Sequence, residues 1–392
     1  MELREIALSL GIQEYPAVLD EVYASLPGLD IDICDTELIA HLDDTMNILD
    51  TNRDALLAAA RALREDPARY LWGQTVAAYF PRATLAEVRA VPLPVAPGAG
   101  DPLPLLILLS QLPSSIEEYR RRGLTEENLR RTLGTFRGCT EVIRRNTGVV
   151  GVDLRYYNWL CLYVKCTIFH HNGFEFEIRD FAPGCTVLKN EKTGQLLPMM
   201  DGVTLHKSGM LLGTAGCEDP EGSREAVFTE TADSYHGIPA INGKAAGPAV
   251  TCPKSEWSIA VAPGDKVLSI HLPKGVDMSK EHLDAAWADA LRLTSRYYPE
   301  ANIRAGFCGS WLLDPTLEAI IGPDSKIVRF GARFARYPHL SAGREVFSFV
   351  FPPNSTDLTK LPENTRLERG LKKRYLEGGY VHAYLGVFLP SF

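Results

Sequence analysis

The sequence predicts an α+β protein in which a helical N-terminal region precedes a region of mixed strands and helices. Apolar residues recur at helical spacing in residues 52–64, a run rich in alanine, leucine and arginine. Apolar and charged residues alternate in residues 174–178, which is typical of a half-buried strand. Residues 266–271 form the strongest strand pattern, and an amphipathic helix pattern follows over residues 279–297. This change of periodicity along the chain supports the fold class.

The N-terminal region contains several further helix patterns. Helices are expected over residues 70–80 and 154–169. Residues 91–104 are rich in proline, which cannot continue a helix or occupy a central strand. We therefore expect an extended connector there, with helices resuming at Ser115 and at Thr125.

The strands of the second region are expected to be short and separated by glycine and proline turns. Besides those already named, the expected strands are residues 186–188, 202–205, 226–229, 257–261, 326–330 and 346–351. A short helix is expected at residues 315–321. The two regions predict two domains, residues 1–150 and residues 151–392.

The composition is that of an ordinary globular protein. The chain has 392 residues and a formal net charge of −8. A mildly acidic chain argues against a protein that coats nucleic acid, so no nucleic-acid partner is expected. The most apolar run, residues 103–112, is about half the roughly 20 residues that a membrane-spanning helix needs, so no membrane association is expected.

Eight cysteines are scattered along the chain, and none forms a C-x-x-C pair. The first residues include acidic side chains and no apolar signal core, so we expect reduced thiols and a cytoplasmic protein. His170 and His171 are adjacent and would point to opposite faces of a strand. No metal site is therefore expected.

The region from Lys266 to Leu313 combines a strand, a loop, a helix and a second strand. The first strand runs into Pro273-Lys274-Gly275 before the helix begins. Backbone N–H groups, the positive end of a helix and the lysine charge would then meet in one place, which suits the phosphate of a nucleotide or of phosphopantetheine. A structural turn explains the same three residues equally well.

Several segments resemble bacterial acyltransferases that have a GNAT-like C-terminal domain. The resemblance is carried by Trp257 with residues 263–273, by residues 308–315 (CGSWLLDP) with 324–330 (DSKIVRF), and by residues 361–369 (LPENTRLER). It covers most of the chain and is densest over residues 235–379. In these proteins a helical N-terminal acyltransferase domain precedes the GNAT-like domain.

The resemblance implies a GNAT-like mixed, mostly antiparallel sheet flanked by helices, and acyl transfer from a pantetheine thioester to an amine. In GNAT enzymes two parallel strands separate, the pantetheine arm adds to the open edge, and the phosphates bind at the next helix. Here the strands would be residues 266–270 and 303–310, and the helix would begin near Ser279. The usual phosphate loop, Gln/Arg-x-x-Gly-x-Gly/Ala, is absent. The donor is therefore either acyl-CoA or the phosphopantetheine of an acyl carrier protein.

On this resemblance, residues at the end of the first strand and in the following loop would bind the donor: Ile270, Leu272, Lys274, Gly275 and Ser279. His271 is the expected general base, because histidine changes its protonation state near neutral pH. The alternative is a strand-end histidine bonded to a backbone group.

Cys308 and Ser310 alternate on the second strand and so face the same side, where either is a candidate to protonate the leaving thiolate. The alternative for Cys308 is a small buried apolar residue. Asp314 precedes a proline and is expected either to cap the short helix or to orient a catalytic group. Trp311 is a candidate substrate platform or a core residue, and Glu177, beside Glu175, is a candidate ligand for a cationic amine.

The leading hypothesis is an N-acyltransferase that acts by direct attack of a small-molecule amine, with no metal. A second hypothesis makes Cys308 an acylated nucleophile with His271 as its base. A third is a non-catalytic binding protein that keeps a GNAT-like fold.

Overall fold

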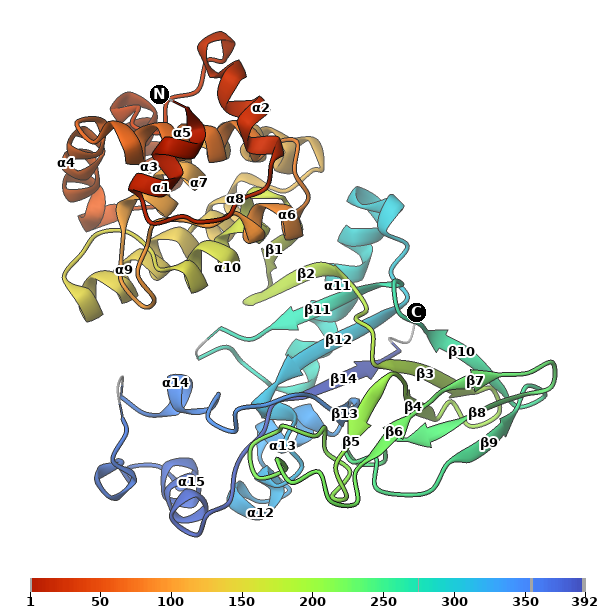
Figure 1. Ribbon diagram of the computed structural model, residues 1–392. Coiled ribbons are helices and arrows are strands. Elements are labelled where there is room, and N and C mark those ends of the chain that lie inside the picture. Colours follow the sequence, from red (N-terminus) through yellow and green to blue (C-terminus); the bar gives the residue numbers. More distant parts are fainter. Residues whose placement is uncertain (1, 274, 353–354, 390–392) are drawn as a thin grey trace. The chain divides into compact units, whose positions relative to one another are not determined.

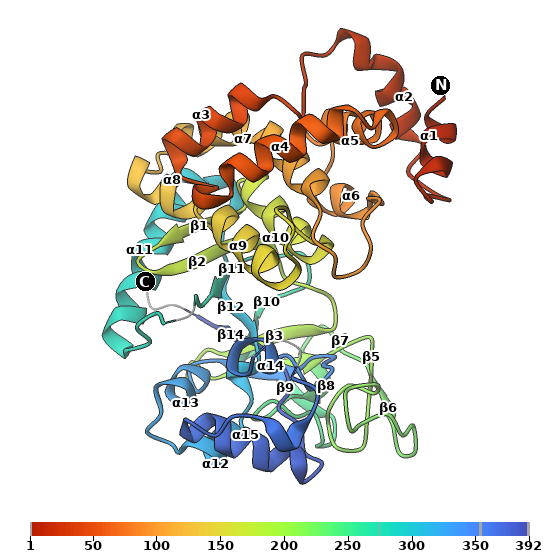
Figure 2. The ribbon, with the colours of Figure 1, turned by 90° about the vertical axis from the view of Figure 1, so that its left-hand side faces the viewer.

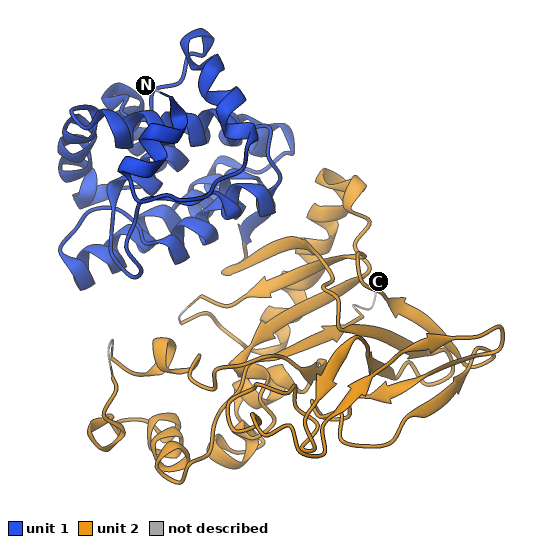
Figure 3. Cartoon of the chain, viewed as in Figure 1, with its two compact units in different colours: residues 1–170 blue, residues 171–392 orange. Residues whose placement is uncertain are grey.

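The computed structural model describes residues 2–273, 275–352 and 355–389. The chain divides into two compact units, residues 1–170 and residues 171–392, which Figure 3 shows in different colours. Each unit is described by itself.

Unit 1 is built from helices. Their bounds are α1 (Leu3–Ser9), α2 (Val18–Ser25), α3 (Thr36–Met46), α4 (Arg53–Arg64), α5 (Pro67–Tyr79), α6 (Leu85–Ala90), α7 (Pro102–Arg121), α8 (Glu126–Leu133), α9 (Thr135–Thr147) and α10 (Leu154–Val164). Helix α7 packs against α4, α5 and α10, and it is visible among them in Figure 2. All residues from Leu103 to Leu109 are buried, so the most apolar run of the sequence is the central helix of this unit.

The helix expected to resume at Ser115 in fact begins at Pro102, so that prediction is wrong. Pro102 and Pro104 lie in the first turn, where backbone N–H groups have no acceptor within the helix and proline is tolerated. The Asp101 side chain caps this turn by accepting a hydrogen bond from the Leu103 N–H (2.8 Å). In the part of the chain that the structure describes, no helix has both the length and the apolar character needed to cross a membrane.

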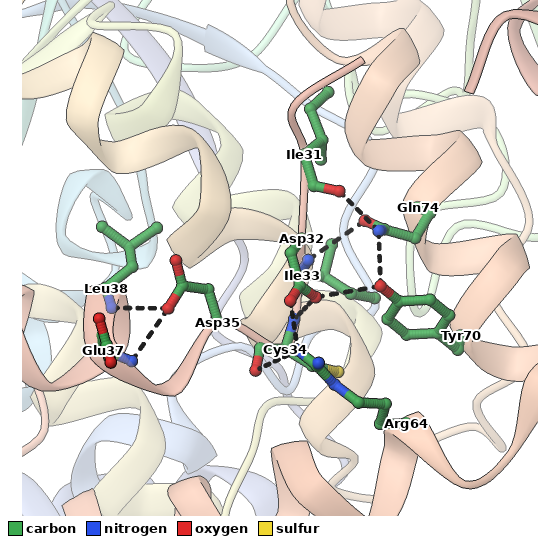
Figure 4. Close-up of polar contacts among 10 residues, drawn as sticks. All are labelled: Ile31, Asp32, Ile33, Cys34, Asp35, Glu37, Leu38, Arg64, Tyr70 and Gln74. Carbon is green, nitrogen blue, oxygen red and sulfur yellow. Dashed lines mark hydrogen bonds and ion pairs between the residues drawn. The ribbon is translucent and has the colours of Figure 1, made fainter. Parts of the chain in front are cut away.

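Residues 31–34, here called the strap, lie beside helix α5 and end in a turn that the Asp35 N–H closes by donating to the Asp32 carbonyl (3.2 Å; Figure 4). The buried Gln74 amide donates from Nε2 to the Ile31 carbonyl (2.6 Å) and accepts from the Ile33 N–H (3.1 Å). One side chain thus satisfies a backbone acceptor and a backbone donor, as a neighbouring strand would.

The carboxylate of Asp32 fixes the strap a second time (Figure 4). The Tyr70 hydroxyl donates to it (3.1 Å), the Cys34 N–H donates to it (2.9 Å), and Arg64 forms an ion pair with it. The Gln74 amide also donates to the Tyr70 hydroxyl (2.9 Å), which joins the two sets of contacts.

Unit 2 contains two sheets of several strands each (Figure 1). The first has the order β1-β2-β11-β12-β14-β13. Its strands within unit 2 are β2 (Phe174–Asp180), β11 (Lys266–His271), β12 (Ala305–Ser310), β13 (Ala335–Pro338) and β14 (Tyr384–Phe388), and β1 (Ile168–His171) spans the boundary between the units. Strands β11 and β12 are parallel, whereas β11 with β2, β12 with β14, and β13 with β14 are antiparallel. The predicted mixed, mostly antiparallel sheet is confirmed.

The second sheet has the order β10-β3-β4-β8-β7, with β9 beside β8. Its strands are β3 (Cys185–Asn190), β4 (Leu196–Met200), β7 (Thr229–Glu230), β8 (Ser234–Pro239), β9 (Val250–Pro253) and β10 (Trp257–Val261); β5 (Val203–Leu205) pairs with β6 (Arg224–Ala226). Val267 and Phe307 of the first sheet share one buried cluster with Val187 and Met200 of the second. One face of the first sheet therefore packs against the second sheet.

Helix α11 (Lys280–Tyr297) covers the opposite face of the first sheet. Its Trp287 packs edge-on against Phe176 of β2 (ring centroids 5.2 Å apart) and against Phe388 of β14 (4.6 Å). The remaining helices of unit 2 are α12 (Leu317–Ile321), α13 (Lys326–Gly331), α14 (Phe347–Val350) and α15 (Arg366–Leu376).

Two expected strands are wrong, because residues 326–330 and 346–351 lie in or around α13 and α14. The Ser325 side chain caps α13 by accepting from the Ile327 N–H (3.3 Å), which fixes a helical turn. Phe347 packs edge-on against Tyr375 of α15 (4.8 Å), so this apolar run is buried by a helix rather than by strand pairing.

Candidate active site

The ladder between the parallel strands β11 and β12 stops before either strand ends. Its three pairs run from Val267↔Ala305 to Ser269↔Phe307. Strand β11 continues to His271 and β12 continues to Ser310, each still paired with its other neighbour. Peptide groups at the carboxyl ends of both strands are thus released from mutual pairing, which is the separation that the family resemblance implies.

His271 lies at this open end and contacts a buried carboxylate. Its Nε2 donates to Glu177 Oε2 (2.9 Å) from the neighbouring strand β2. The Glu177 side chain is 9% exposed and the His271 side chain is 28% exposed. A carboxylate that accepts from Nε2–H fixes the tautomer in which Nδ1 is the proton acceptor. The pair therefore has the arrangement of an oriented general base.

Strand register places both residues, and one more, on the same face of the sheet. Ser269 is opposite Glu177 and Val267 is opposite Arg179, so alternate residues of β2 and β11 face the second sheet with His271. Arg179 Nη1 lies 3.9 Å from Glu177 Oε2, the oxygen that also contacts His271.

Cys308 lies on the other face. It follows Phe307, which faces the second sheet, and successive residues of a strand alternate. The residue is 1% exposed, and burial raises the pKa of its thiol to about 12. The structure thus does not bring Cys308 together with His271. A neutral thiol on the opposite face does not have the geometry of an acylated nucleophile activated by that imidazole.

Ser310, Asp314 and Trp311 have structural partners. The Ser310 hydroxyl accepts from the Leu312 N–H (3.1 Å). Asp314 accepts from the Thr316 N–H (2.8 Å) and from the His382 N–H (2.7 Å), which caps the turn before α12 and fixes the chain before β14. Trp311 is 8% exposed and belongs to a buried cluster of unit 2, so its ring is mainly core.

The residues expected to bind the donor lie along the end of β11 and the loop before α11. Ile270 is buried, Leu272 is half-buried, and Gly275 has a positive φ of 85° in the turn. Ser279 is the N-cap of α11, and its N–H and hydroxyl both donate to Asp277 (3.0 and 2.7 Å). Lys274 lies outside the described residues.

The start of α11 carries charges that the sequence reading did not single out. Lys326 donates to Asp277 (3.0 Å), and hydrogen bonds from Ser279 and Lys326 hold the pKa of the Asp277 carboxyl well below its ordinary value. Lys280 pairs with Asp284 (2.7 Å), which also pairs with Arg333. These cations come from two elements far apart in sequence, so no local motif could identify them.

The sequence reading also missed Arg179. It follows Glu177 by two residues, and i, i+2 alternation on β2 could have placed the two on one face. Its relation to His271 depends on strand register, which the sequence does not specify. Within residues 2–273, 275–352 and 355–389, no group of three or more His, Cys, Asp or Glu side chains is arranged to hold a metal ion.

Two family models match the chain. The model of the N-acyltransferase N-terminal domain matches residues 37–166, and that of the GNAT-like C-terminal domain matches residues 176–388. No curated protein matches it.

Solved structures of similar fold cover the whole chain, and the chain covers the whole of each. An acyltransferase in complex with decanoyl-CoA has a TM-score of 0.66 at 16% identity, and an acyltransferase mutant with octanoyl-CoA has 0.65 at 17%. An acyltransferase in complex with CoA and 10C-teicoplanin has 0.64 at 16%. These likenesses agree with the fold derived above. Because the GNAT-like model spans more than half of the sequence, the chain is an acyltransferase that belongs to the family of proteins with a GNAT-like C-terminal domain.

Proposed function

We propose that this acyltransferase moves the acyl group of acyl-CoA to an amine of a small molecule by direct attack. The observation that carries the proposal is the buried Glu177 bonded to His271 at the open ends of β11 and β12. The description of the N-terminal domain as that of an N-acyltransferase supports an amine acceptor. The acyl-CoA and teicoplanin named for the similar structures support this donor class and a small-molecule acceptor.

The donor would bind along the open edge of β11. Its pantetheine amides would pair with peptide groups near Ile270 and Leu272, which follow the last pair of the ladder with β12. Its phosphates would lie near Gly275, Ser279 and the start of α11, where the helix end is positive and Lys280 and Lys326 are nearby in the fold.

The reaction then needs one base and one proton donor. The amine nitrogen attacks the thioester carbonyl carbon, and His271 Nδ1 takes a proton from that nitrogen. The new C–N bond forms, the C–S bond breaks, and the coenzyme A thiolate takes a proton from solvent, because Ser310 lies with Cys308 on the other face of β12. Glu177 holds the imidazole and stabilises its protonated form, and it is therefore a positioning residue.

The test is thiol release from octanoyl- or decanoyl-CoA with a panel of primary amines. We expect amine-dependent release by the wild-type protein and a loss of about 10²- to 10⁴-fold in His271→Gln, the range for a general base. His236→Gln is the matched control, because this histidine of β8 is exposed on the second sheet and its side chain contacts the Thr251 hydroxyl (3.1 Å). Full activity of His271→Gln would contradict the assigned base.

Calorimetric titration distinguishes the two donors. Micromolar binding of coenzyme A, about 8 kcal/mol, supports the nucleotide thioester as donor. Binding of a phosphopantetheinylated carrier protein without binding of coenzyme A would replace it by the carrier-bound thioester. Binding of neither would contradict the proposed function.

A further inference from the structure

One cation faces the same side of the sheet as the proposed base and is only loosely neutralised. Arg179 of β2 is four residues from Glu175, which is opposite His271 in the ladder. Its side chain is 40% exposed, and its carboxylate contact within the described residues is Nη1 to Glu177 Oε2 at 3.9 Å. That distance is too long for a hydrogen bond. Glu177 instead accepts from His271 at 2.9 Å.

The guanidinium is nevertheless held in place. Its central carbon lies 5.4 Å from the centre of the Phe307 ring, which is itself buried in the sheet core. Stacking on an aromatic face restrains a guanidinium without using its N–H donors. A restrained guanidinium with unused donors is suited to bind a planar carboxylate through two parallel hydrogen bonds.

Arg179 and His271 lie close enough for one small molecule to contact both. Arg179 Nη1 and His271 Nε2 contact the same carboxylate oxygen, at 3.9 and 2.9 Å, so they lie within about 7 Å of each other. The base atom Nδ1 belongs to the same imidazole ring and therefore lies within about 9 Å of Arg179 Nη1. A hydrogen bond of about 2.9 Å at each end leaves a span that an amine and a carboxylate joined by a few bonds can cover.

The donor phosphates are expected elsewhere. They would bind near the start of α11, which covers the opposite face of the sheet through Trp287. Arg179 faces the second sheet with Phe307. Its charge is thus placed for the acceptor rather than for coenzyme A.

From these observations we infer that the acceptor is an amine that carries a carboxylate a few bonds from its nitrogen, and that Arg179 binds this carboxylate. Arg179 then determines acceptor specificity, while His271 deprotonates the amine. This inference rests on the proposed function and deepens it by naming the chemical class of the acceptor.

The test compares α-, β- and γ-amino acids with their carboxamides as acceptors, using decanoyl-CoA as donor. For at least one chain length we expect the wild-type protein to prefer the acid in kcat/KM. In Arg179→Met this preference is lost: kcat/KM for the acid falls about 10- to 100-fold, as expected for lost charge-assisted hydrogen bonds, and kcat/KM for the carboxamide changes less than about threefold. Arg179→Lys keeps the charge but lacks the two parallel N–H donors of a guanidinium. Its kcat/KM for the acid should lie between those of the wild type and Arg179→Met. Lys192→Met removes an exposed cation paired with Glu256 and is the matched control.

A second readout does not depend on turnover. The preferred amino acid is titrated calorimetrically into the protein with coenzyme A present, and its affinity should fall in Arg179→Met while that of coenzyme A stays unchanged. Retained amino-acid binding without thiol release would contradict the proposed function but support the inference. Three results would overturn the inference: equal losses for acid and carboxamide, a loss of coenzyme A affinity, or a wild-type protein that prefers the carboxamide at every chain length.

Discussion

In unit 1 the side chains of Gln74 and Arg64 bind backbone groups of residues 31–34, whereas in unit 2 the side chains of Glu177, His271 and Arg179 contact one another. The strap cluster uses its amide and carboxylate to satisfy backbone groups of residues 31–34. The second cluster joins its imidazole and guanidinium to one shared carboxylate oxygen.

The two clusters differ in how exposed their polar side chains are. In the strap, Gln74 is 8% exposed and uses both ends of its amide on backbone partners. In the second cluster the imidazole is 28% exposed and the guanidinium 40% exposed, while the carboxylate between them is nearly buried. A buried polar group that is fully bonded contributes to stability, and one that keeps donor or acceptor capacity at an open strand end is suited to bind substrate. The predictions below separate these two roles.

The largest effect on stability is expected in the strap. Gln74→Leu keeps the volume but leaves the Ile33 N–H and the Ile31 carbonyl without their partner. Unbonded buried polar groups of this kind cost about 2–4 kcal/mol together in free energy of unfolding. Urea unfolding measures this loss, and kcat below the transition should stay within about twofold of the wild type.

Gln111→Leu is the matched control for this experiment. Gln111 is also a buried glutamine of unit 1, and its amide donates to the Ser110 hydroxyl of the preceding residue (2.9 Å). If Gln111→Leu lowered the free energy of unfolding as much as Gln74→Leu, the loss in Gln74→Leu could not be assigned to its hydrogen bonds with the strap.

In the second cluster the expected effect is on activity. Glu177→Gln keeps the shape but removes the charge that stabilises the protonated imidazole. We expect kcat/KM to fall about 10- to 100-fold, because the base becomes weaker and less well oriented.

The control for this change is Glu230→Gln, which removes an exposed carboxylate paired with Lys254. It should leave kcat/KM within about twofold of the wild type. If Glu177→Gln instead lowered the thermal midpoint by many degrees and left kcat/KM of the folded enzyme unchanged, Glu177 would have a structural role only.

Sequence patterns predicted much of this fold because the elements are locally consistent. Strand β11 was expected at residues 266–271 and is observed there, and the expected helix over residues 279–297 is α11. The secondary-structure predictions that were wrong concern short segments. Residues 326–330 are rich in apolar and β-branched side chains, a composition that fits a strand, but the Ser325 cap makes them a helix. Residues 102–114 contain three prolines, two of which lie in the tolerant first turn of α7.

The site was only partly predictable for a different reason. His271 was identified from its place at a strand end, and the family resemblance supplied that place. Glu177 was identified as a ligand for an amine, yet in the structure its partner is His271, because β2 pairs with β11 in one particular register. The same register places Arg179 beside them. A shift of one residue would turn every one of these side chains to the other face, and no local pattern in the sequence specifies it.

The smallest effect on activity is expected at Cys308, on the face opposite to the base. Cys308→Ala should keep kcat within about twofold, and no acyl adduct of the wild-type thiol should appear by mass spectrometry. Burial raises the pKa of this thiol to about 12, whereas an exposed thiol in the unfolded chain has a pKa of about 9. The native state therefore holds a proton that the unfolded state has lost above pH 9, and stability falls with rising pH by about 1.4 kcal/mol per unit for this group.

Cys308→Ala should remove that contribution, so the free energy of unfolding declines less steeply than in the wild type between about pH 9 and pH 11. Cys161→Ala is the matched control, because burial also raises the pKa of that thiol, in α10 of unit 1, to about 12. Both substitutions should flatten the alkaline decline equally and spare the activity. If Cys308→Ala alone abolished turnover, the direct mechanism would have to give way to an acyl-enzyme. If the two substitutions behave alike, neither thiol takes part in the reaction, and the reaction takes place on the face of the sheet that carries His271.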